Sequence, residues 1–248
     1  MRLDIMTFKR IYFTKWLFTA AVFCIISGSL FAKSVYKEIF GSDYQTALLF
    51  IEENGPQVAQ QLKGYGADPD ILVPVIFPEL IRYSLIQDEM ETTGLKIFYV
   101  NYGEDYADFS IGYFQMKPSF AENIESYFIK HPRKECTTLR QYSKSEKNLQ
   151  KSIRRQRVRR LENPSWQTYY LACFYHIVQD KFSNKLASFN TVKKIAFFAA
   201  AYNAGFQADF KTILAFRNKR FFPNGAMGFS EQYNYSDIAV DYYENYIR

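Results

Sequence analysis

The sequence predicts a mainly α-helical protein of the α+β kind, with a small hairpin or irregular lobe between its helices. Three observations lead to this prediction. Asn, Asp and Ser residues stand in front of apolar segments with helical spacing, where they would cap helices. Residues rich in β-branched and aromatic side chains gather in one stretch, 95–116. No internal repeat or low-complexity linker divides the chain.

The N-terminus has the pattern of an export signal. Basic residues precede a nearly uncharged run at 16–32, and small residues close that run at Ala32. We therefore expect residues 1–32 to be a signal peptide cleaved after Ala32, and residues 33–248 to be one domain. An uncleaved membrane anchor is the alternative, because 17 residues lie at the lower edge of what spans a bilayer. Both interpretations predict an exported, periplasmic or envelope-associated protein.

Composition points away from several classes of protein. The formal net charge of +6 is modest, and it predicts no nucleic-acid partner. The basic run 151–160 is interpreted as a solvated helical face. The two histidines are far apart and there is no Cys-x-x-Cys pair, so we expect no metal site. The chain also lacks a phosphate-binding glycine motif, so we expect no cofactor. Cys136 and Cys173 would remain after export, either as a disulfide or as two free thiols.

Capping and stop signals predict the first helices. Ser42 would cap a helix that runs to Glu53 and stops at residues 54–56, which read Asn-Gly-Pro. Asp68 followed by Pro69 would begin the next helix, which is almost wholly apolar. Because Pro74 and Pro78 lie inside it, we expect this helix to be kinked or broken near Glu79.

The rest of the chain is predicted in the same way. Ile97 to Val100 is β-prone and is followed by a turn signal, so a hairpin or irregular lobe would lead into Gly112. Two capping boxes would open helices at Ser119 and at Ser143, the latter with Glu146. Further helices would be capped by Asn163 and by Asn190 or Thr191, with a stop at Gly205 and a last helix at 236–246.

Three short stretches carry the candidate chemistry. The first places Glu79 inside an apolar run, the second contains Gly112-x-x-Gln115, and the third is an Ala-rich segment ending in Tyr202-Asn203-x-Gly205. A carboxylic acid delivers a proton near neutral pH only if an apolar setting raises its pKa. Glu79 has that setting in the sequence. Glu89 and Glu91 are rivals, but they stand in a polar run.

The order and spacing of these stretches resemble the lysozyme-like superfamily of lytic transglycosylases and goose-type lysozymes, over about residues 72–205. The resemblance implies a lysozyme-like fold with Glu79 as the catalytic acid. The family usually has a serine directly after that glutamate, where this chain has Leu80. Ser84 and a more distant segment would therefore have to supply what that serine does.

The resemblance also implies a set of substrate-binding residues. The glycine of the second stretch would let the backbone approach the sugar, and the amide of Gln115 would bind a hydroxyl or N-acetyl group. Asp108 is the candidate for a second carboxylate, although it could equally be a turn or cap residue. The implied substrate-binding residues are Ser110, Gly112, Tyr113, Gln115, Tyr202 and Asn203.

The expected function is cleavage of the β-1,4 bond between N-acetylmuramic acid and N-acetylglucosamine in peptidoglycan by a lytic transglycosylase. One alternative is a lysozyme- or chitinase-like glycoside hydrolase that uses Asp108 as its second carboxylate. Another is a cell-wall-binding module without catalysis. We expect a monomer whose partners are peptidoglycan glycan strands, with membrane association through the N-terminal segment as an open alternative.

Overall fold

The computed structural model describes residues 34–85, 89–142, 149–223 and 231–248. These residues form a mainly helical unit, which confirms the predicted mainly α class. The expected signal or anchor segment at 1–32 and the capping box at Ser143 lie outside the described residues. The helices are α2 (Val35–Gly64), α3 (Pro69–Leu85), α4 (Glu89–Tyr102), α5 (Pro118–Lys130), the 3-10 helix η1 (Lys134–Tyr142), α6 (Gln150–Leu161), α7 (Pro164–Leu186), α8 (Thr191–Ala204), α9 (Phe210–Phe216) and α10 (Tyr235–Tyr246).

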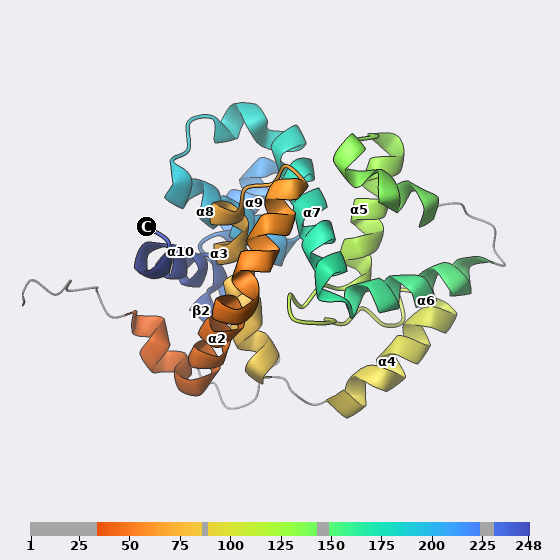
Figure 1. Cartoon of the computed structure of the whole chain (residues 1–248), viewed down its shortest axis with the longest axis horizontal. Coiled ribbons are helices and arrows are strands. Elements are labelled where there is room, and N and C mark those ends of the chain that lie inside the picture. Colours follow the sequence, from red (N-terminus) through yellow and green to blue (C-terminus); the bar gives the residue numbers. More distant parts are fainter. Residues whose placement is uncertain (1–33, 86–88, 143–148, 224–230) are drawn as a thin grey trace, which may run out of the picture. The chain divides into compact units, whose positions relative to one another are not determined.

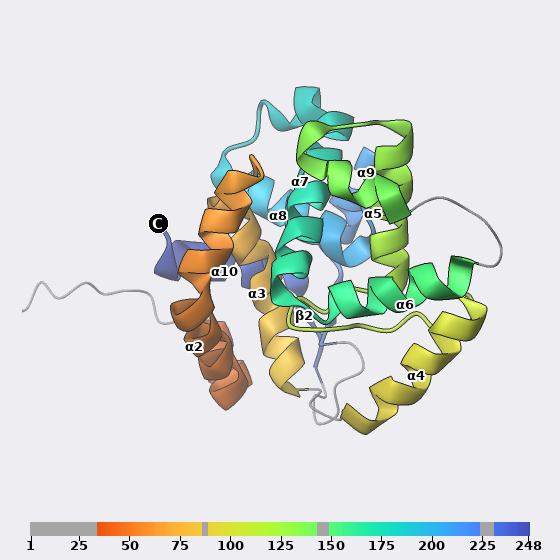
Figure 2. The ribbon, with the colours of Figure 1, turned by 45° about the vertical axis from the view of Figure 1, so that its right-hand side comes forward.

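Helix α3 is the buried element around which the other helices gather. Every residue from Ile71 to Ile81 is buried, as expected of a helix that is apolar on all sides. Helices α2, α8 and α10 pack against it, and Figures 1 and 2 show them around α3. Among the helices that the structure describes, none is long and apolar enough to cross a membrane.

Helix α2 continues through residues 54–56, so the predicted stop there is wrong. A proline removes only one backbone hydrogen bond from a helix, and buried residues on both sides of Pro56 hold α2 against the core. The non-helical angles of Gly41 (φ 50°, ψ −116°) divide the element instead. The helical run that was expected to begin at Ser42 therefore follows that kink.

Helix α3 is not broken at Glu79, although a kink or a break was expected there from its two prolines. It extends to Leu85 with Pro74 and Pro78 inside it. Burial of apolar surface on all sides of a helix contributes about 25 cal/mol per Å². Around α3 this contribution offsets the two backbone hydrogen bonds that the prolines remove, so Glu79 is carried on a continuous buried helix.

The predicted hairpin in residues 95–116 is wrong for its first half. Ile97 to Val100 belongs to α4, although its residue types favour a strand. Tyr99 is fully buried, and its hydroxyl donates to Glu122 on α5, so tertiary packing decides the conformation. The second half is irregular, as predicted, with one isolated β-bridge between Ile111 and Met116. An antiparallel pair of short strands lies near the C-terminus, as β1 (Arg220–Phe222) and β2 (Tyr233–Asn234).

Most of the predicted helix ends in the second half of the chain are confirmed. The side chain of Asn163 accepts from the amide of Trp166 at 3.1 Å and caps α7, and Asn190 caps α8 in the same way. Gly205 ends α8 with a φ of 98°, a conformation that favours glycine. Helix α10 begins one residue before the predicted start.

The predicted capping box at Ser119 is wrong. Helix α5 begins at Pro118 without a side-chain cap from its own N-cap residue, Lys117. Glu122 does not reach back to the helix start, because its carboxylate accepts from Tyr99 and pairs with Arg157. The amide and hydroxyl of Ser119 are instead bound by a carboxylate from outside the helix, Asp108.

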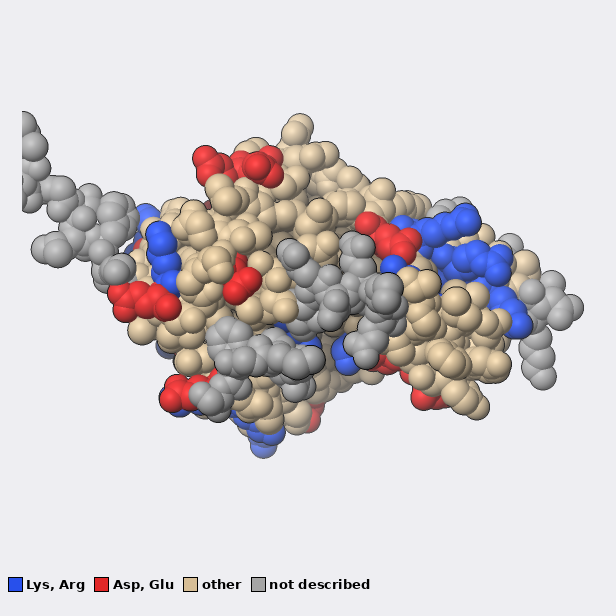
Figure 3. Space-filling model, turned by 90° about the horizontal axis from the view of Figure 1, so that it is seen from below, with Lys and Arg blue, Asp and Glu red and all other residues tan. Residues whose placement is uncertain are grey.

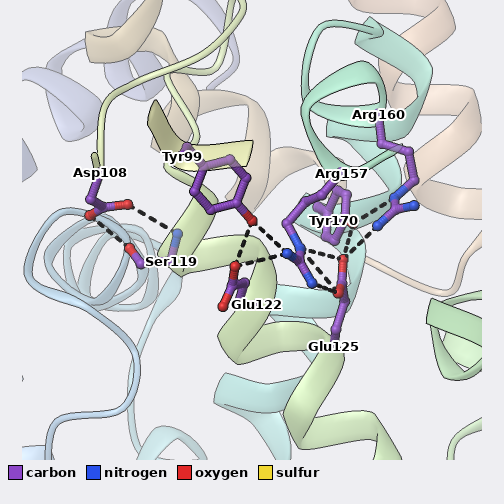
Figure 4. A network of polar contacts seen from close by, with 8 residues as sticks. All are labelled: Tyr99, Asp108, Ser119, Glu122, Glu125, Arg157, Arg160 and Tyr170. Atoms are coloured by element: carbon purple, nitrogen blue, oxygen red, sulfur yellow. Dashed lines mark hydrogen bonds and ion pairs between the residues drawn. The ribbon is translucent and has the colours of Figure 1, made fainter. Parts of the chain in front are cut away.

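The basic run 151–160 lies on α6, and two of its arginines are buried rather than solvated. Arg157 pairs with Glu125 on α5, and Arg160 donates to the same carboxylate at 2.8 Å (Figure 4). The hydroxyl of Tyr170 also donates to Glu125. Figure 3 shows Lys and Arg side chains gathered at the end of the molecule where Figure 1 places α6. The exposed bases of α6 are Lys151, Arg155 and Arg159.

The two cysteines of the described chain lie side by side in the core. Cys136 belongs to η1 and Cys173 to α7, and both are buried. Their sulfur atoms are 2.6 Å apart. The fold therefore brings together two cysteines that are separated by 36 residues, and burial raises the pKa of the Cys173 thiol well above its ordinary value.

Replacing Arg157 with Met is expected to lower the free energy of unfolding by about 3–5 kcal/mol, because Glu125 would lose one buried partner. Arg155→Met, on the exposed face of the same helix, should change it by about 0.5 kcal/mol or less. Urea denaturation of both variants measures the difference. Equal small effects would mean that the buried pair does not stabilise the fold.

Candidate active site

Glu79 lies two turns before the end of α3 and is only 4% exposed. Its Oε2 has no hydrogen-bond partner among the described residues, and Nη1 of Arg82 lies 3.9 Å from it. Burial raises the pKa of this carboxyl to about 7, against the opposing effects of Arg82 and Lys117. A carboxyl with this pKa keeps its proton near neutral pH and can also give it up.

Tyr235, which the sequence analysis did not identify, lies beside Glu79. It is the first residue of α10, it is buried, and its side chain is within hydrogen-bonding range of Glu79. Its hydroxyl donates to the carbonyl oxygen of Val75, one turn before Glu79, at 2.8 Å. The hydrogen bond with Tyr235 lowers the pKa of the Glu79 carboxyl, against the larger opposite effect of burial. No motif in the sequence marked this tyrosine, because its place follows from how α10 packs on α3.

Tyr202 connects the third stretch with the other two. It lies near the end of α8, and its hydroxyl donates to the carbonyl oxygen of Phe114 at 2.8 Å. Burial raises the pKa of Tyr202 well above its ordinary value, and the nearby Glu79 carboxylate raises it further. Tyr202 therefore lies close to Glu79 and also holds the turn between Gly112 and Gln115.

Gln115 lies in a strained turn. The backbone groups of Ile111 and Met116 exchange two hydrogen bonds, of 3.0 and 3.1 Å, across residues 112–115. Gln115 has a φ of 49°, in the left-handed region that non-glycine residues rarely occupy. Its amide nitrogen donates to the carbonyl of Gly112 at 2.9 Å, and the amide oxygen of this half-buried side chain accepts no hydrogen bond from the residues that the structure describes.

Gly112 is needed for a reason other than the expected approach of a sugar. A Cβ at this position would lie 1.9 Å from Nε2 of Gln167 and 2.7 Å from the carbonyl oxygen of Leu161. Gln167 is fully buried on α7 and donates to the carbonyls of Ile111 and Leu161. Its amide oxygen accepts from Phe114. Gln167 thus fixes the turn through three hydrogen bonds, and its role could not be predicted because a lone glutamine on a helix carries no signal in the sequence.

The other implied substrate-binding residues are partly accessible. Tyr113 is half-buried, with its ring 4.6 Å from that of Phe50 and 4.7 Å from that of Tyr83. Ser110 and Asn203 are also half-buried, and their side chains make no hydrogen bond within the described part of the chain. The amide of Asn203 and the hydroxyl of Ser110 are therefore available to an external ligand.

Asp108 caps α5. Its two oxygens accept from the amide and the hydroxyl of Ser119, at 3.0 and 2.8 Å (Figure 4). The ammonium group of Lys117 lies 3.5 Å from the same carboxylate and is close enough to Glu79 to lower its pKa. The cap function, which the sequence had left open, accounts for these contacts.

The geometry gives Ser84 another partner than the candidate site. The hydroxyl of Ser84 donates to Asp43 on α2 at 2.7 Å, so it does not replace the serine that Leu80 displaces. Leu80 itself is buried in the core. Glu89 and Glu91 lie in the first turn of α4, and their side chains are outside the described part of the structure.

The Gly112→Ala variant is expected to lower the free energy of unfolding by about 2–4 kcal/mol, because the added Cβ clashes with Gln167 at a positive φ of 70°. Gly64→Ala is the matched control, since a Cβ there meets nothing within 4 Å. Thermal and urea unfolding measure both. If Gly112→Ala were as stable as the control, the contact with Gln167 would not constrain the turn.

The stability of the wild-type protein is expected to fall relative to Glu79→Gln as the pH rises from about 4.5 to about 7. In that window the unfolded carboxyl, with its ordinary pKa of 4.5, loses its proton while the folded carboxyl keeps it. The unfolded state then binds fewer protons, so rising pH favours unfolding, by roughly 3 kcal/mol in total. Urea midpoints of both proteins at several pH values measure this. A constant difference across the window would contradict the raised pKa.

Comparison of the chain with protein-family models found no match. Comparisons with curated protein sequences and with solved structures found no match either.

Proposed function

We propose that this protein is a lytic transglycosylase that cleaves the β-1,4 bond between N-acetylmuramic acid and N-acetylglucosamine in peptidoglycan. The observation that carries the proposal is the buried carboxyl of Glu79, whose pKa is raised to about 7. Tyr202 lies beside it and holds the turn that presents Gln115. The resemblance of the three stretches to the lysozyme-like superfamily supplies the substrate class.

In this proposal Glu79 acts first as an acid and then as a base. The protonated carboxyl gives its proton to the glycosidic oxygen as the bond to the N-acetylmuramic acid carbon breaks. The N-acetyl group of that sugar stabilises the carbon by intramolecular attack. The Glu79 carboxylate then takes the proton of the O6 hydroxyl, whose oxygen closes a 1,6-anhydro ring and displaces the N-acetyl oxygen. The proton count balances, and no second carboxylate is required.

The contacts of Asp108 favour this route over hydrolysis. A hydrolase needs a base that holds water about 6.5–9.5 Å from the acid, or a nucleophile about 5–5.5 Å from it. Asp108 already accepts from Ser119 with both oxygens and pairs with Lys117. Export to the periplasm or cell envelope, through the segment at 1–32, belongs to the same proposal. If the protein cleaves no peptidoglycan, the alternative function is a cell-wall-binding module without catalysis.

Glu79→Gln is expected to lower cleavage of purified peptidoglycan by at least about 100- to 10,000-fold, because the amide keeps the size of the side chain but delivers no proton. Release of soluble muropeptides, followed by mass spectrometry, measures both rate and product. The wild-type product should carry the anhydro ring and be lighter by one water than a hydrolysis product. Glu52→Gln, exposed on α2, is the control and should retain wild-type activity.

The same assay separates the two carboxylates. Asp108→Asn should cost roughly tenfold or less, the scale of one ordinary hydrogen bond, and leave the anhydro product in place. A loss of about three orders of magnitude, with reducing-end sugars from the wild type, would instead identify Asp108 as a general base and the enzyme as a hydrolase. If the wild-type protein binds peptidoglycan without cleaving it, the interpretation as a cell-wall-binding module without catalysis would be the one that remains.

A further inference from the structure

The fold brings Cys136 and Cys173 together from two separate elements. Cys136 lies in η1 and Cys173 in the middle of α7, and both side chains are almost completely buried. Their sulfur atoms are in direct contact. A disulfide can form only where the backbone holds two cysteines close together. The folded chain therefore meets the requirement that the sequence alone could not show to be met.

The junction between η1 and α7 is otherwise joined at the surface by an ion pair. The guanidinium of Arg133, directly before η1, lies 2.9 Å from the carboxylate of Asp180 on α7, and both side chains are more than one-third exposed. Exposed ion pairs contribute little to stability, because water and salt screen them. A covalent bond between the two cysteines would be a much stronger connection at the same junction.

The surroundings of the two cysteines are those of a structural pair. Burial raises the pKa of the Cys173 thiol well above its ordinary value, so the folded protein holds little of the thiolate that reacts with other molecules. A structural zinc ion takes four ligands. Within the described ranges, no group of three or more His, Cys, Asp or Glu side chains could hold a metal ion. A disulfide is the use of two paired cysteines that fits this setting.

We propose that Cys136 and Cys173 form a disulfide that fastens η1 to α7. The inference rests on the export that belongs to the proposed function, because disulfides persist in oxidising compartments outside the cytosol. While the chain folds, the thiolate of one cysteine attacks the disulfide of a protein oxidant and releases one sulfur of that oxidant as a thiol. The other cysteine then attacks this mixed disulfide and releases the second sulfur. The two cysteines together lose two electrons and two protons, and the oxidant is left as a dithiol.

The bond would close a loop that contains residues behind the candidate site. The loop covers the 36 residues between the two cysteines, among them Arg157 and Gln167. Arg157 pairs with the buried Glu125, and Gln167 fixes the turn that carries Gln115. Closing a loop lowers the conformational entropy of the unfolded chain. The disulfide would therefore stabilise the packing on which that turn depends.

The first test follows the two cysteines in the full chain, expressed for export with its own N-terminal segment. The protein is alkylated in denaturant without reduction and then digested with trypsin, which cuts after Lys and Arg. The peptides 135–140 and 161–181 contain the two cysteines. They should be found joined, with a mass two hydrogen atoms below the sum of the separate peptides. After reduction, both should appear separately and alkylated.

Two variants control this measurement. Cys24→Ala, which changes the remaining cysteine of the chain, should leave the joined peptides in place. Cys173→Ala should leave the peptide 135–140 alkylated without any reduction. Free thiols in the wild-type protein, both as isolated and after refolding with reduced and oxidised glutathione, would overturn the inference, whereas peptidoglycan cleavage by the same protein would leave the proposed function intact. Free thiols as isolated that form the bond in glutathione would sustain the inference about the pair and contradict the export.

The second test measures what the bond does for the fold. Reduction of the wild-type protein should lower its Tm by about 5–15 °C, the shift expected for a closed loop of this length in a domain of this size. The double variant with Cys136→Ala and Cys173→Ala should show the same Tm with and without reductant. If reduction separates the two wild-type peptides but leaves the Tm unchanged, the bond does not fasten η1 to α7.

Discussion

The structure depends on one constraint: a carboxyl group is carried on a helix that is buried on all sides. An ionised carboxylate in such a place would be strongly unfavourable without a counter-charge. Glu79 meets this constraint by remaining protonated, because burial raises its pKa to about 7. The burial that holds α3 in the core therefore also creates the proton donor, and stability and proposed chemistry share one cause.

The contrast with Glu125 shows how environment divides the roles of two buried glutamates. Glu125 is as deeply buried as Glu79, but Arg157, Arg160 and Tyr170 surround its carboxylate. A carboxylate held by two guanidinium groups is a structural tie between α5 and α6. Glu79 instead has an oxygen without a hydrogen-bond partner in the described residues, with one guanidinium, that of Arg82, at 3.9 Å and the phenol of Tyr235 within hydrogen-bonding range. Of the two, only Glu79 has the surroundings of a general acid.

Local signals in the sequence predicted what depends on local interactions. The caps at Asn163 and Asn190 and the stop at Gly205 are set by a few neighbouring atoms, and these predictions hold. The prediction that Pro56 lies beyond the first helix failed, because packing against the core outweighs a single lost hydrogen bond. The strand expected at Ile97 to Val100 failed for a similar reason, since Tyr99 is buried against α5 and α6.

Part of the candidate site could be predicted and part could not. Glu79, Gln115 and Tyr202 were identified from three motifs, and the structure brings Tyr202 close enough to Glu79 for the carboxylate to raise the pKa of the phenol. Gln167 and Tyr235 were missed because their contacts join segments far apart in the chain, such as Gln167 with Ile111 and Tyr235 with Val75. Asp108 was found as a carboxylate near the site, but only the fold shows that it caps α5.

The central claim is that Glu79 is protonated in the folded protein near neutral pH. Carboxyl ¹³C NMR of the folded wild-type protein, with Glu79→Gln to assign the signal by difference, tests it most directly. The account predicts that this one signal titrates near pH 7, where burial places its pKa. A titration midpoint at or below the ordinary value of 4.5 would show an ionised carboxylate at neutral pH. That result would contradict the assignment of Glu79 as the proton donor.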